Sequence, residues 1–290
     1  MISGDFNSMP VGMPVEDFSY IVDGAVYSAL EPKSEAIIPA QKGLIESMAK
    51  VVMPLVTAGA PSPLTARSLS ISFPADSCSP GDRYQGDIPA TAALAGALRP
   101  NGGVTKFIRQ IVCTHARIRY FIKFPSGFDW RRGGKLPGLS STDVSASGGN
   151  QATSGVTSFT ARLMWQSGGR ITPYLYMADN VSRFGTIYGV GLGSSVDVLS
   201  GSWVEIVEEV RLNDVGVSNG TCRISVNGVE LCNRTDLIWR TNQSLKIDGV
   251  YFCLFFGGHT YGYGDNTYET NVNTSLEISD IEYTVISSTY

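Results

Sequence analysis

The feature that most constrains the fold is the alternation of side chains along residues 115–124. One set of alternate positions is Ala116, Ile118, Tyr120, Ile122 and Phe124, and the other is His115, Arg117, Arg119, Phe121 and Lys123. Successive side chains of a β-strand point to opposite faces of a sheet, so a period of two predicts a strand. One face of this strand is apolar and the other is largely basic, which indicates a half-buried sheet.

Strand-like runs recur along much of the chain. They lie near residues 68–73, 157–165, 172–177, 185–190, 203–212, 221–226, 229–232, 249–256 and 275–286. Gly-rich turns separate them, and a composition with 32 glycines and 17% charged residues is typical of a loop-rich β protein. We predict an all-β fold, a β-sandwich or jelly roll with few short helices, in one domain that spans residues 1–290.

The N-terminal part of the chain is less regular. Residues 41–54 fit a short helix that ends before Pro54, and they fit equally a strand around Val51 and Val52. Residues 74–103 are rich in Pro and Gly and contain an Ala-rich stretch. We predict that they form a loop insertion at one rim of the fold.

The overall charge excludes some partners. A net charge of −4 gives no global attraction to polyanions, so an acidic polymer needs a local basic patch and nucleic acid is not expected as a partner. No apolar run approaches the roughly 20 residues that span a bilayer, so no membrane insertion is expected. The first residues, Met1-Ile-Ser-Gly-Asp-Phe6, lack the basic start and apolar core of a signal peptide.

The five cysteines form no C-x-x-C pair, which argues against a zinc site. Two of them flank a predicted hairpin whose two-residue turn is Asn227-Gly228. In that register Cys222 lies opposite Asn233, so Cys222 and Cys232 point to opposite faces and a disulfide between them is disfavoured. We expect free, buried thiols.

A lone lysine lies in the most distinctive run of the sequence. The run is Phe124-Pro-Ser-Gly-Phe-Asp-Trp-Arg-Arg-Gly-Gly-Lys-Leu-Pro-Gly-Leu139, and it holds Lys135 between a Gly-Gly pair and Leu-Pro-Gly. Pro137 and Gly138 predict a rigid turn, which would hold Lys135 in a fixed position rather than on a mobile tip.

Two pairs of polar side chains follow on strand-like runs. Thr160 and Arg162 are two residues apart, as are Tyr174 and Tyr176, so each pair shares one face of its strand. Cations beside two phenols suit an acidic sugar and proton transfer. Tyr and Arg on strands are also common cross-strand packing partners, so the pattern alone leaves both interpretations open.

The order and spacing of these residues resemble the polysaccharide lyases of family 14, the group that includes alginate and glucuronate lyases of algal viruses. The specific part is the Phe-Pro-x-Gly-Phe-Asp-Trp…Gly-Gly-Lys-Leu-Pro-Gly-Leu run, and the similarity is dense from about Arg117 to Tyr188. Residues 69–77 resemble the family's early core strand, whereas residues 1–66 match poorly. The resemblance implies a jelly roll whose concave sheet forms a glycan-binding groove.

The resemblance also implies a catalytic set, which falls on Lys135, Thr160, Arg162, Tyr174 and Tyr176. A lyase acting on a uronate removes the proton at C5, beside a carboxylate, and expels O4. Lys135 and Arg162 are suited to stabilise the charge that develops on the carboxylate, and a tyrosine is suited to proton transfer because nearby cations lower the pKa of a phenol. The family often has Ser where this chain has Thr160, and which tyrosine is the base stays open.

Four further residues are candidates for substrate contacts. Arg131 and Arg132 precede the lysine run and would either extend a basic groove or simply lie solvated at its rim. His115 lies on the basic strand face and is an alternative base, because a histidine side chain can accept or donate a proton at physiological pH. His259, in a Gly- and Tyr-rich loop, would stack on sugar rings or cover one end of the groove, unless that loop is an ordinary turn.

Two functions from different classes remain. The first is an enzyme that cleaves an acidic polysaccharide by endolytic β-elimination, with no cofactor and no metal. The second is a non-catalytic jelly-roll protein that binds glycan or decorates a virus or phage particle, assembled with other particle proteins. The start without a signal peptide favours a particle-associated protein or one released by lysis, which is compatible with either function.

Overall fold

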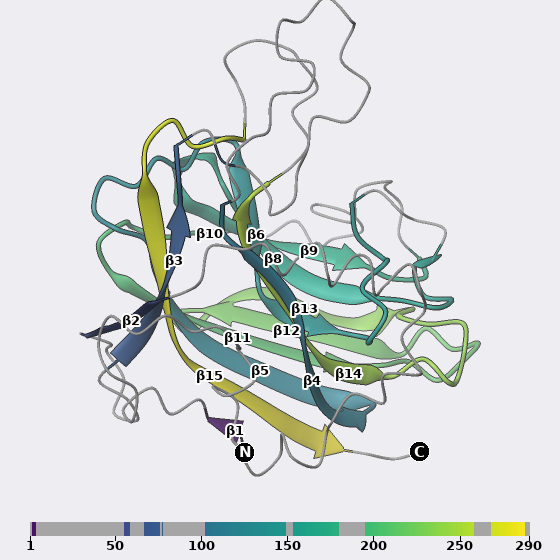
Figure 1. Ribbon diagram of the computed structural model, residues 1–290. Coiled ribbons are helices and arrows are strands. Elements are labelled where there is room, and N and C mark those ends of the chain that lie inside the picture. Colours follow the sequence, from purple (N-terminus) through teal and green to yellow (C-terminus); the bar gives the residue numbers. More distant parts are fainter. Residues whose placement is uncertain are drawn as a thin grey trace, which may run out of the picture.

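Two stacked antiparallel sheets make up the computed structural model of the chain (Figure 1). The structure describes residues 2–3, 55–58, 67–75, 77, 102–148, 153–179, 195–257 and 268–287. Within these ranges the regular structure is strand apart from one 3₁₀ turn at Ser167–Gly169. The predicted all-β jelly-roll sandwich is confirmed. No helix in these ranges is long and apolar enough to cross a membrane.

The larger sheet has eight strands in the order β13-β12-β11-β5-β15-β3-β2, with β1 also paired to β15. Its strands are β1 (Ile2–Ser3), β2 (Leu55–Ala58), β3 (Arg67–Phe73), β5 (His115–Lys123), β11 (Trp203–Arg211), β12 (Gly220–Val226), β13 (Val229–Leu237) and β15 (Thr274–Ser287). The central position of β5 explains why its alternating pattern is so clear, because one of its faces meets the second sheet.

The smaller sheet has seven strands in the order β10-β9-β8-β6-β14-β4, with β7 paired to both β14 and β8. Its strands are β4 (Val104–Cys113), β6 (Gly133–Leu136), β7 (Gly138–Ser140), β8 (Thr160–Gln166), β9 (Arg170–Tyr176), β10 (Val196–Asp197) and β14 (Ile247–Phe256). Three of these, β8, β9 and β14, match predicted runs, and four do not. Strands β4 and β10 were not predicted, and β6 and β7 occupy the segment that was interpreted as a turn.

Some predictions fall outside the described residues. They concern the helix or strand at 41–54, the strand near 185–190 and nearly all of the loop insertion at 74–103.

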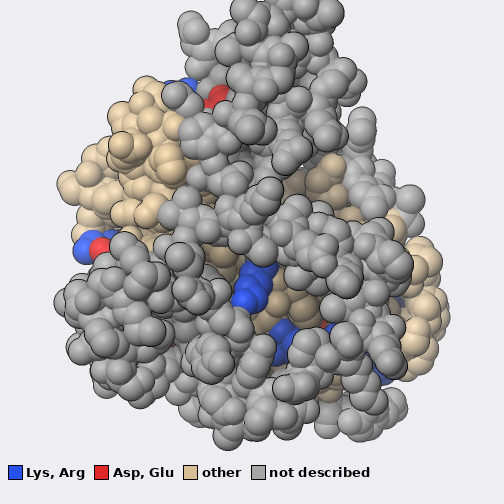
Figure 2. Space-filling model, viewed as in Figure 1, with Lys and Arg blue, Asp and Glu red and all other residues tan. Residues whose placement is uncertain are grey.

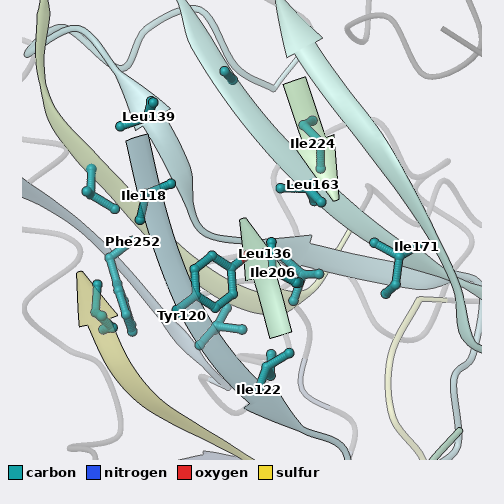
Figure 3. Close-up of a cluster of buried hydrophobic side chains, with 14 of the residues drawn as sticks. Ile118, Tyr120, Ile122, Leu136, Leu139, Leu163, Ile171, Ile206, Ile224 and Phe252 are labelled. Atoms are coloured by element: carbon teal, nitrogen blue, oxygen red, sulfur yellow. The ribbon is translucent and has the colours of Figure 1, made fainter. Parts of the chain in front are cut away.

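The core lies between the two sheets. Ile118, Tyr120 and Ile122 of β5 are fully buried and point into the same cluster as Leu136 and Leu163 of the smaller sheet (Figure 3). The apolar face predicted for residues 115–124 is therefore the core face. Burying a side chain of this size contributes roughly 1.5–3 kcal/mol each, so this interface holds the smaller sheet in place.

The aromatic part of the distinctive run packs at one end of this core. The ring centroids of Phe124 and Trp130 are 4.6 Å apart, and those of Phe128 and Phe256 are 5.4 Å apart in a stacked arrangement. Trp165 of β8 packs against the same group, with its ring centroid 5.7 Å from that of Phe124. This half of the run is thus structural, and it fixes the chain where β6 begins.

A buried carboxyl group lies within the core. Glu208 of β11 is fully buried, and its Oε2 accepts a hydrogen bond from the backbone N–H of Leu139 in β7 at 3.1 Å. Burial raises the pKa of this carboxyl well above its usual range. The hydroxyl of Tyr120 in β5 donates to the carbonyl of Pro137, between β6 and β7, at 3.0 Å. The larger sheet therefore fixes the connection between β6 and β7 from the core side.

The hairpin of β12 and β13 corrects one predicted register. Val226 pairs with Val229 around the Asn227-Gly228 turn as predicted, but a bulge between Ile224 and Ser225 shifts the remaining pairs. Cys222 then pairs with Arg234 and Ile224 with Cys232, so both cysteines are buried on the same face. The predicted opposite facing was wrong because the bulge adds one residue. The four described cysteines, Cys113, Cys222, Cys232 and Cys253, are free thiols.

Candidate active site

Three strands bring the predicted catalytic residues together on the face of the smaller sheet turned away from the core. In β8, Ala161 and Leu163 face the core, so Thr160 and Arg162 face the other way. Thr160 pairs with Tyr176 and Arg162 with Tyr174 across β8 and β9. Lys135 of β6 pairs with Met164 on the opposite side of β8. The convergence follows from register alone, since directly paired side chains share a face.

The glycines of the lysine run are explained by close approach. A Cβ added to Gly134 would lie 2.0 Å from the Trp165 ring, and one added to Gly138 would lie 1.7 Å from the carbonyl oxygen of Ala161 and 2.8 Å from the Cα of Arg162. Any side chain at either position would push β6 or β7 away from β8. The spacing Gly-Gly-Lys-Leu-Pro-Gly thus sets Lys135 next to Arg162.

Lys135 is part of a strand and is buried, whereas the sequence predicted a rigid turn that holds it in a fixed position. It is 7% exposed. Its Nζ lies 3.9 Å from the ring centroid of Tyr174 and 3.1 Å from the Sδ of Met164. The sequence did not predict this strand because β6 has only four residues, two of them glycine, and an alternation of polar and apolar side chains cannot be recognised in so short a run.

Arg162 is almost fully enclosed, with 2% of its surface exposed. Its guanidinium carbon lies 4.9 Å from the ring centroid of Tyr251 and 5.1 Å from that of Tyr174. Nη1 is 3.8 Å from the Sγ of Cys253, whereas Nε and Nη2 have no hydrogen-bond partner among the residues that the structure describes. A buried donor without a partner costs about 1–3 kcal/mol, and a charged one more. Arg162 therefore has two strong donors that no described residue engages.

The two tyrosine hydroxyls form a pair. The hydroxyl oxygens of Tyr174 and Tyr176 are 3.2 Å apart, and their rings pack edge to face. Burial raises the pKa of the Tyr174 phenol well above its usual range, and Arg162 offsets this only in part. The expectation that the nearby cations lower the pKa was wrong for Tyr174, because loss of hydration outweighs the attraction to Arg162. Tyr174 is a protonated phenol at neutral pH.

Thr160 makes a structural contact with its hydroxyl. The Oγ1 donates to the carbonyl of Ala146 at 2.9 Å, and Ala146 packs with Met164, Tyr174 and Tyr176. Residues around Ala146 thus lie against the tyrosine pair. Both Thr160 and Tyr176 are fully buried. The prediction of a solvent-open groove at these residues was wrong: they converge, but in a buried cluster.

Comparisons with known proteins identify the family of the chain. The family described as Polysaccharide lyase 14 matches residues 62–281. The chain belongs to polysaccharide lyase family 14. A comparison with curated proteins found no match.

Solved structures of alginate lyases share the fold. A variant of the alginate lyase Aly36B in complex with alginate tetrasaccharide aligns with a TM-score of 0.67 and 16% identity over 100% of this chain and 98% of that one. A marine alginate lyase from Aplysia kurodai gives 0.58 and 20% over 80% and 87% of the two chains. The alginate lyase vAL-1 from Chlorella virus gives 0.59 and 19% over 79% and 88%.

The two arginines before the lysine differ in their surroundings. Arg131 has its Nη1 3.6 Å from a carboxylate oxygen of Asp129. Arg132 is exposed, and its guanidinium carbon lies 4.9 Å from the ring centroid of Tyr268. The phenol of Tyr268 is close enough to Tyr174 to contribute to the raised pKa of Tyr174. Arg132 therefore lies at the rim of the cluster formed by Lys135, Arg162, Tyr174 and Tyr176. Lys and Arg atoms gather near the centre of the face shown in Figure 2, with few acidic atoms beside them.

His115 is not part of the cluster. It lies on the solvent face of the larger sheet, where its Nε2 is 3.0 Å from Oε1 of Glu209. The whole basic face of β5 is matched by acidic neighbours on β11 and β15. The ion pairs are His115–Glu209, Arg117–Glu209, Arg119–Glu205, Arg119–Glu282 and Lys123–Glu277. The prediction of His115 as a base or substrate contact is wrong, because the core of the sandwich separates it from the tyrosines. His259 lies outside the described residues.

Strand β14 supplies two neighbours of Arg162 that the sequence patterns did not connect with the site. Tyr251 and Cys253 are two residues apart and share the face of Lys135 and Arg162. The hydroxyl of Tyr251 accepts a hydrogen bond from Thr105 at 3.1 Å. Tyr251 and Cys253 are two residues apart, which puts them on one face of a strand, but only the pairing of β14 with β6 shows that this is the face of Lys135. Within the ranges described, no three His, Cys, Asp or Glu residues are grouped as metal ligands.

Proposed function

We propose that this lyase cleaves a uronate-containing polymer of the alginate or glucuronan type by β-elimination, with Lys135, Arg162, Tyr174 and Tyr176 as its catalytic residues. The observation that carries the proposal is the buried guanidinium of Arg162, whose Nε and Nη2 lack partners beside a pair of tyrosine hydroxyls. That combination suits a substrate with a carboxylate next to an exchangeable carbon-bound proton.

The carboxylate is the acceptor that Arg162 lacks. A guanidinium edge binds both oxygens of a carboxylate in two parallel hydrogen bonds. No acidic residue in the described part of the chain forms an ion pair with Arg162, so none of those residues fills this position. As the C5 proton leaves, negative charge moves onto the carboxylate oxygens, and Arg162 and Lys135 stabilise it in a site from which water is largely excluded.

The tyrosine pair handles the protons. In β-elimination the C5–H bond and the C4–O4 bond break, a C4=C5 double bond forms, and O4 gains a proton. Tyr174 is protonated at neutral pH and is suited to donate to O4. The hydroxyls of Tyr174 and Tyr176 are 3.2 Å apart, so a proton taken from C5 by one tyrosine has a short path to the tyrosine that donates to O4.

The substrate class has support from the relatives. The Aly36B structure holds alginate tetrasaccharide, and the Aplysia kurodai and Chlorella virus proteins are alginate lyases. Arg132, at the rim of the cluster, is placed to extend the basic surface along a polymer. Arg131, Thr160 and His259 stay predicted contacts on sequence grounds alone.

The decisive experiment incubates the protein with alginate, glucuronan and related polyuronates and follows the absorbance of the new C4=C5 bond. We expect product from the wild type and a loss of about 10²–10⁴-fold in rate for Tyr176→Phe. Lys135→Met is a better test than Lys135→Ala, because Lys135 is buried and Met keeps its volume.

Tyr283→Phe is the matched control. Tyr283 is also buried, but its hydroxyl donates to the carbonyl of Ile111, far from Arg162 in the pairing of the sheets. We expect it to keep full activity. Absence of product from the wild type on every polyuronate would favour a non-catalytic glycan-binding protein instead, whereas full activity of Tyr176→Phe would leave the lyase and remove this tyrosine from the mechanism.

A further inference from the structure

The pairing of β14 is irregular at the site. Strand β14 pairs with β6 through Phe255 and Lys135, and with β7 through Tyr251 and Gly138. Between these pairs two residues of one chain segment, 136–137, lie opposite three of the other, 252–254, and Cys253 is the central one. Such bulges occur next to active sites, where they redirect a side chain. Here Cys253 lies opposite the connection between β6 and β7.

The thiol of Cys253 joins the two halves of the cluster. Its Sγ donates to the carbonyl of Leu136 at 3.3 Å and accepts from Nη1 of Arg162 at 3.8 Å. A thiol has one hydrogen to donate and a weak acceptor on sulfur, so both capacities are used. Burial raises the pKa of Cys253, which keeps the hydrogen on sulfur at neutral pH. Cys253 is fully buried, so these contacts are shielded from water.

The thiol engages only one side of the guanidinium. Nη1 contacts the thiol of Cys253, while Nε and Nη2 have no partner within the described ranges. Nε–H and Nη2–H point in the same direction along one edge of the planar group, and that edge matches the spacing of two carboxylate oxygens. The rings of Tyr174 and Tyr251, at 5.1 and 4.9 Å from the guanidinium carbon, limit its rotation.

We propose that Cys253 is a positioning residue of the lyase site: its thiol holds Nη1 of Arg162 so that the Nε–Nη2 edge faces the uronate carboxylate. Cys253 touches no reacting atom and acts through Arg162. This rests on the proposed function, because the carboxylate is the ligand of that edge. It adds a residue, and a specific edge of Arg162, to the mechanism.

The test compares two replacements of the thiol. Cys253→Val fills the site with a slightly larger apolar side chain and removes the donor and the acceptor, whereas Cys253→Ser keeps both in a slightly smaller one. We expect Cys253→Val to lower kcat/KM about 10- to 100-fold, because the guanidinium of Arg162 would no longer be aligned with the carboxylate of the substrate. Most of the loss should appear in kcat, since the carboxylate charge grows in the transition state. Cys253→Ser should recover activity to within about threefold of the wild type.

Cys113→Val is the control, because Cys113 is another buried thiol and contacts Tyr283 rather than Arg162. It should be fully active. Full activity of Cys253→Val, or a Cys253→Ser variant as impaired as Cys253→Val, would overturn the positioning role. So would loss of the cooperative unfolding transition in both Cys253→Val and Cys253→Ala, since the thiol would then belong to the fold. A wild type without product on any polyuronate removes the lyase proposal itself, which is a different result from an active wild type that tolerates Cys253→Val.

Discussion

Replacing Arg162 by Met should remove activity and stabilise the fold. The buried Nε and Nη2 of Arg162 lack partners, and each such donor costs about 1–3 kcal/mol, or roughly 2–6 kcal/mol together. Against this stand the contacts of the guanidinium with the rings of Tyr174 and Tyr251, at about 0.5–2 kcal/mol each. The difference leaves Arg162→Met more stable by about 1–2 kcal/mol, and such gains are typical when an apolar side chain replaces a buried charge.

The assay combines thermal unfolding with the absorbance of the unsaturated product. A gain of about 1 kcal/mol raises the unfolding midpoint by roughly 2–4 °C in a protein somewhat smaller than this one, so we expect a rise of a few degrees. We expect activity to fall by at least about 10²–10³, the loss typical of removing one preorganised charge contact. A saturated oligouronate should raise the midpoint of the wild type and leave that of Arg162→Met unchanged.

Arg240 provides the matched control. It is also 2% exposed, but its Nε donates to the carbonyl of Asn213 at 3.1 Å and its Nη1 to that of Leu245 at 2.7 Å. Arg240→Met leaves those carbonyls without their donors, so we expect it to lower the midpoint while the protein that stays folded keeps its activity. A midpoint of Arg162→Met as low as that of Arg240→Met would refute the argument, because Arg162 would then be a structural residue with its own partners.

Three other predictions follow from single contacts. Gly138→Ala should destabilise by at least about 1–3 kcal/mol and lower activity, because its Cβ would lie 1.7 Å from the carbonyl oxygen of Ala161. Gly127→Ala meets nothing within 4 Å but has a φ of 74°, so it should lose about 1–2 kcal/mol of stability and keep full activity. Burial raises the pKa of Asp280 to about 6, so ionising this carboxyl lowers the stability of the folded protein as pH rises from about 4 through 6. In denaturant unfolding, Asp280→Asn should be more stable than wild type by up to about 3 kcal/mol at pH 8, and the difference should shrink toward pH 4. A difference that does not change with pH would contradict this. Burial also raises the pKa of Glu208, so Glu208→Gln, which keeps an acceptor for the buried N–H below the site, should match the wild type in activity and gain midpoint relative to it as pH increases from 5 to 8.

The parts of the fold that were predictable are those governed by local periodicity. A half-buried strand repeats every two residues whatever it packs against, so β5 and its core face could be identified from residues 115–124 alone. The same rule placed Thr160 with Arg162 and Tyr174 with Tyr176. It failed at β6 and β7, where glycines needed for close approach to β8 imitate a turn.

What the sequence could not supply are the contacts that form only when strands pair and pack. His115 seemed a candidate base because its strand face is basic, yet the carboxylate of Glu209 on β11 is its partner. The bulge that puts Cys222 and Cys232 on one face is a property of two paired strands and not of either alone. The phenol of Tyr174 has a raised pKa because the folded structure removes water from it, an effect that no neighbour in sequence predicts.

The sequence by itself therefore determined the fold class through its periodicity, and its resemblance to polysaccharide lyase family 14 indicated the family and the five residues that converge around the lysine run. Only the tertiary structure decided that the cluster is buried, that Tyr174 stays protonated, and that β14 brings Cys253 and Tyr251 against Arg162. Hydration and strand pairing are set by atoms that meet only after folding, and they convert a list of candidate side chains into an arginine with one free edge beside two hydroxyl groups.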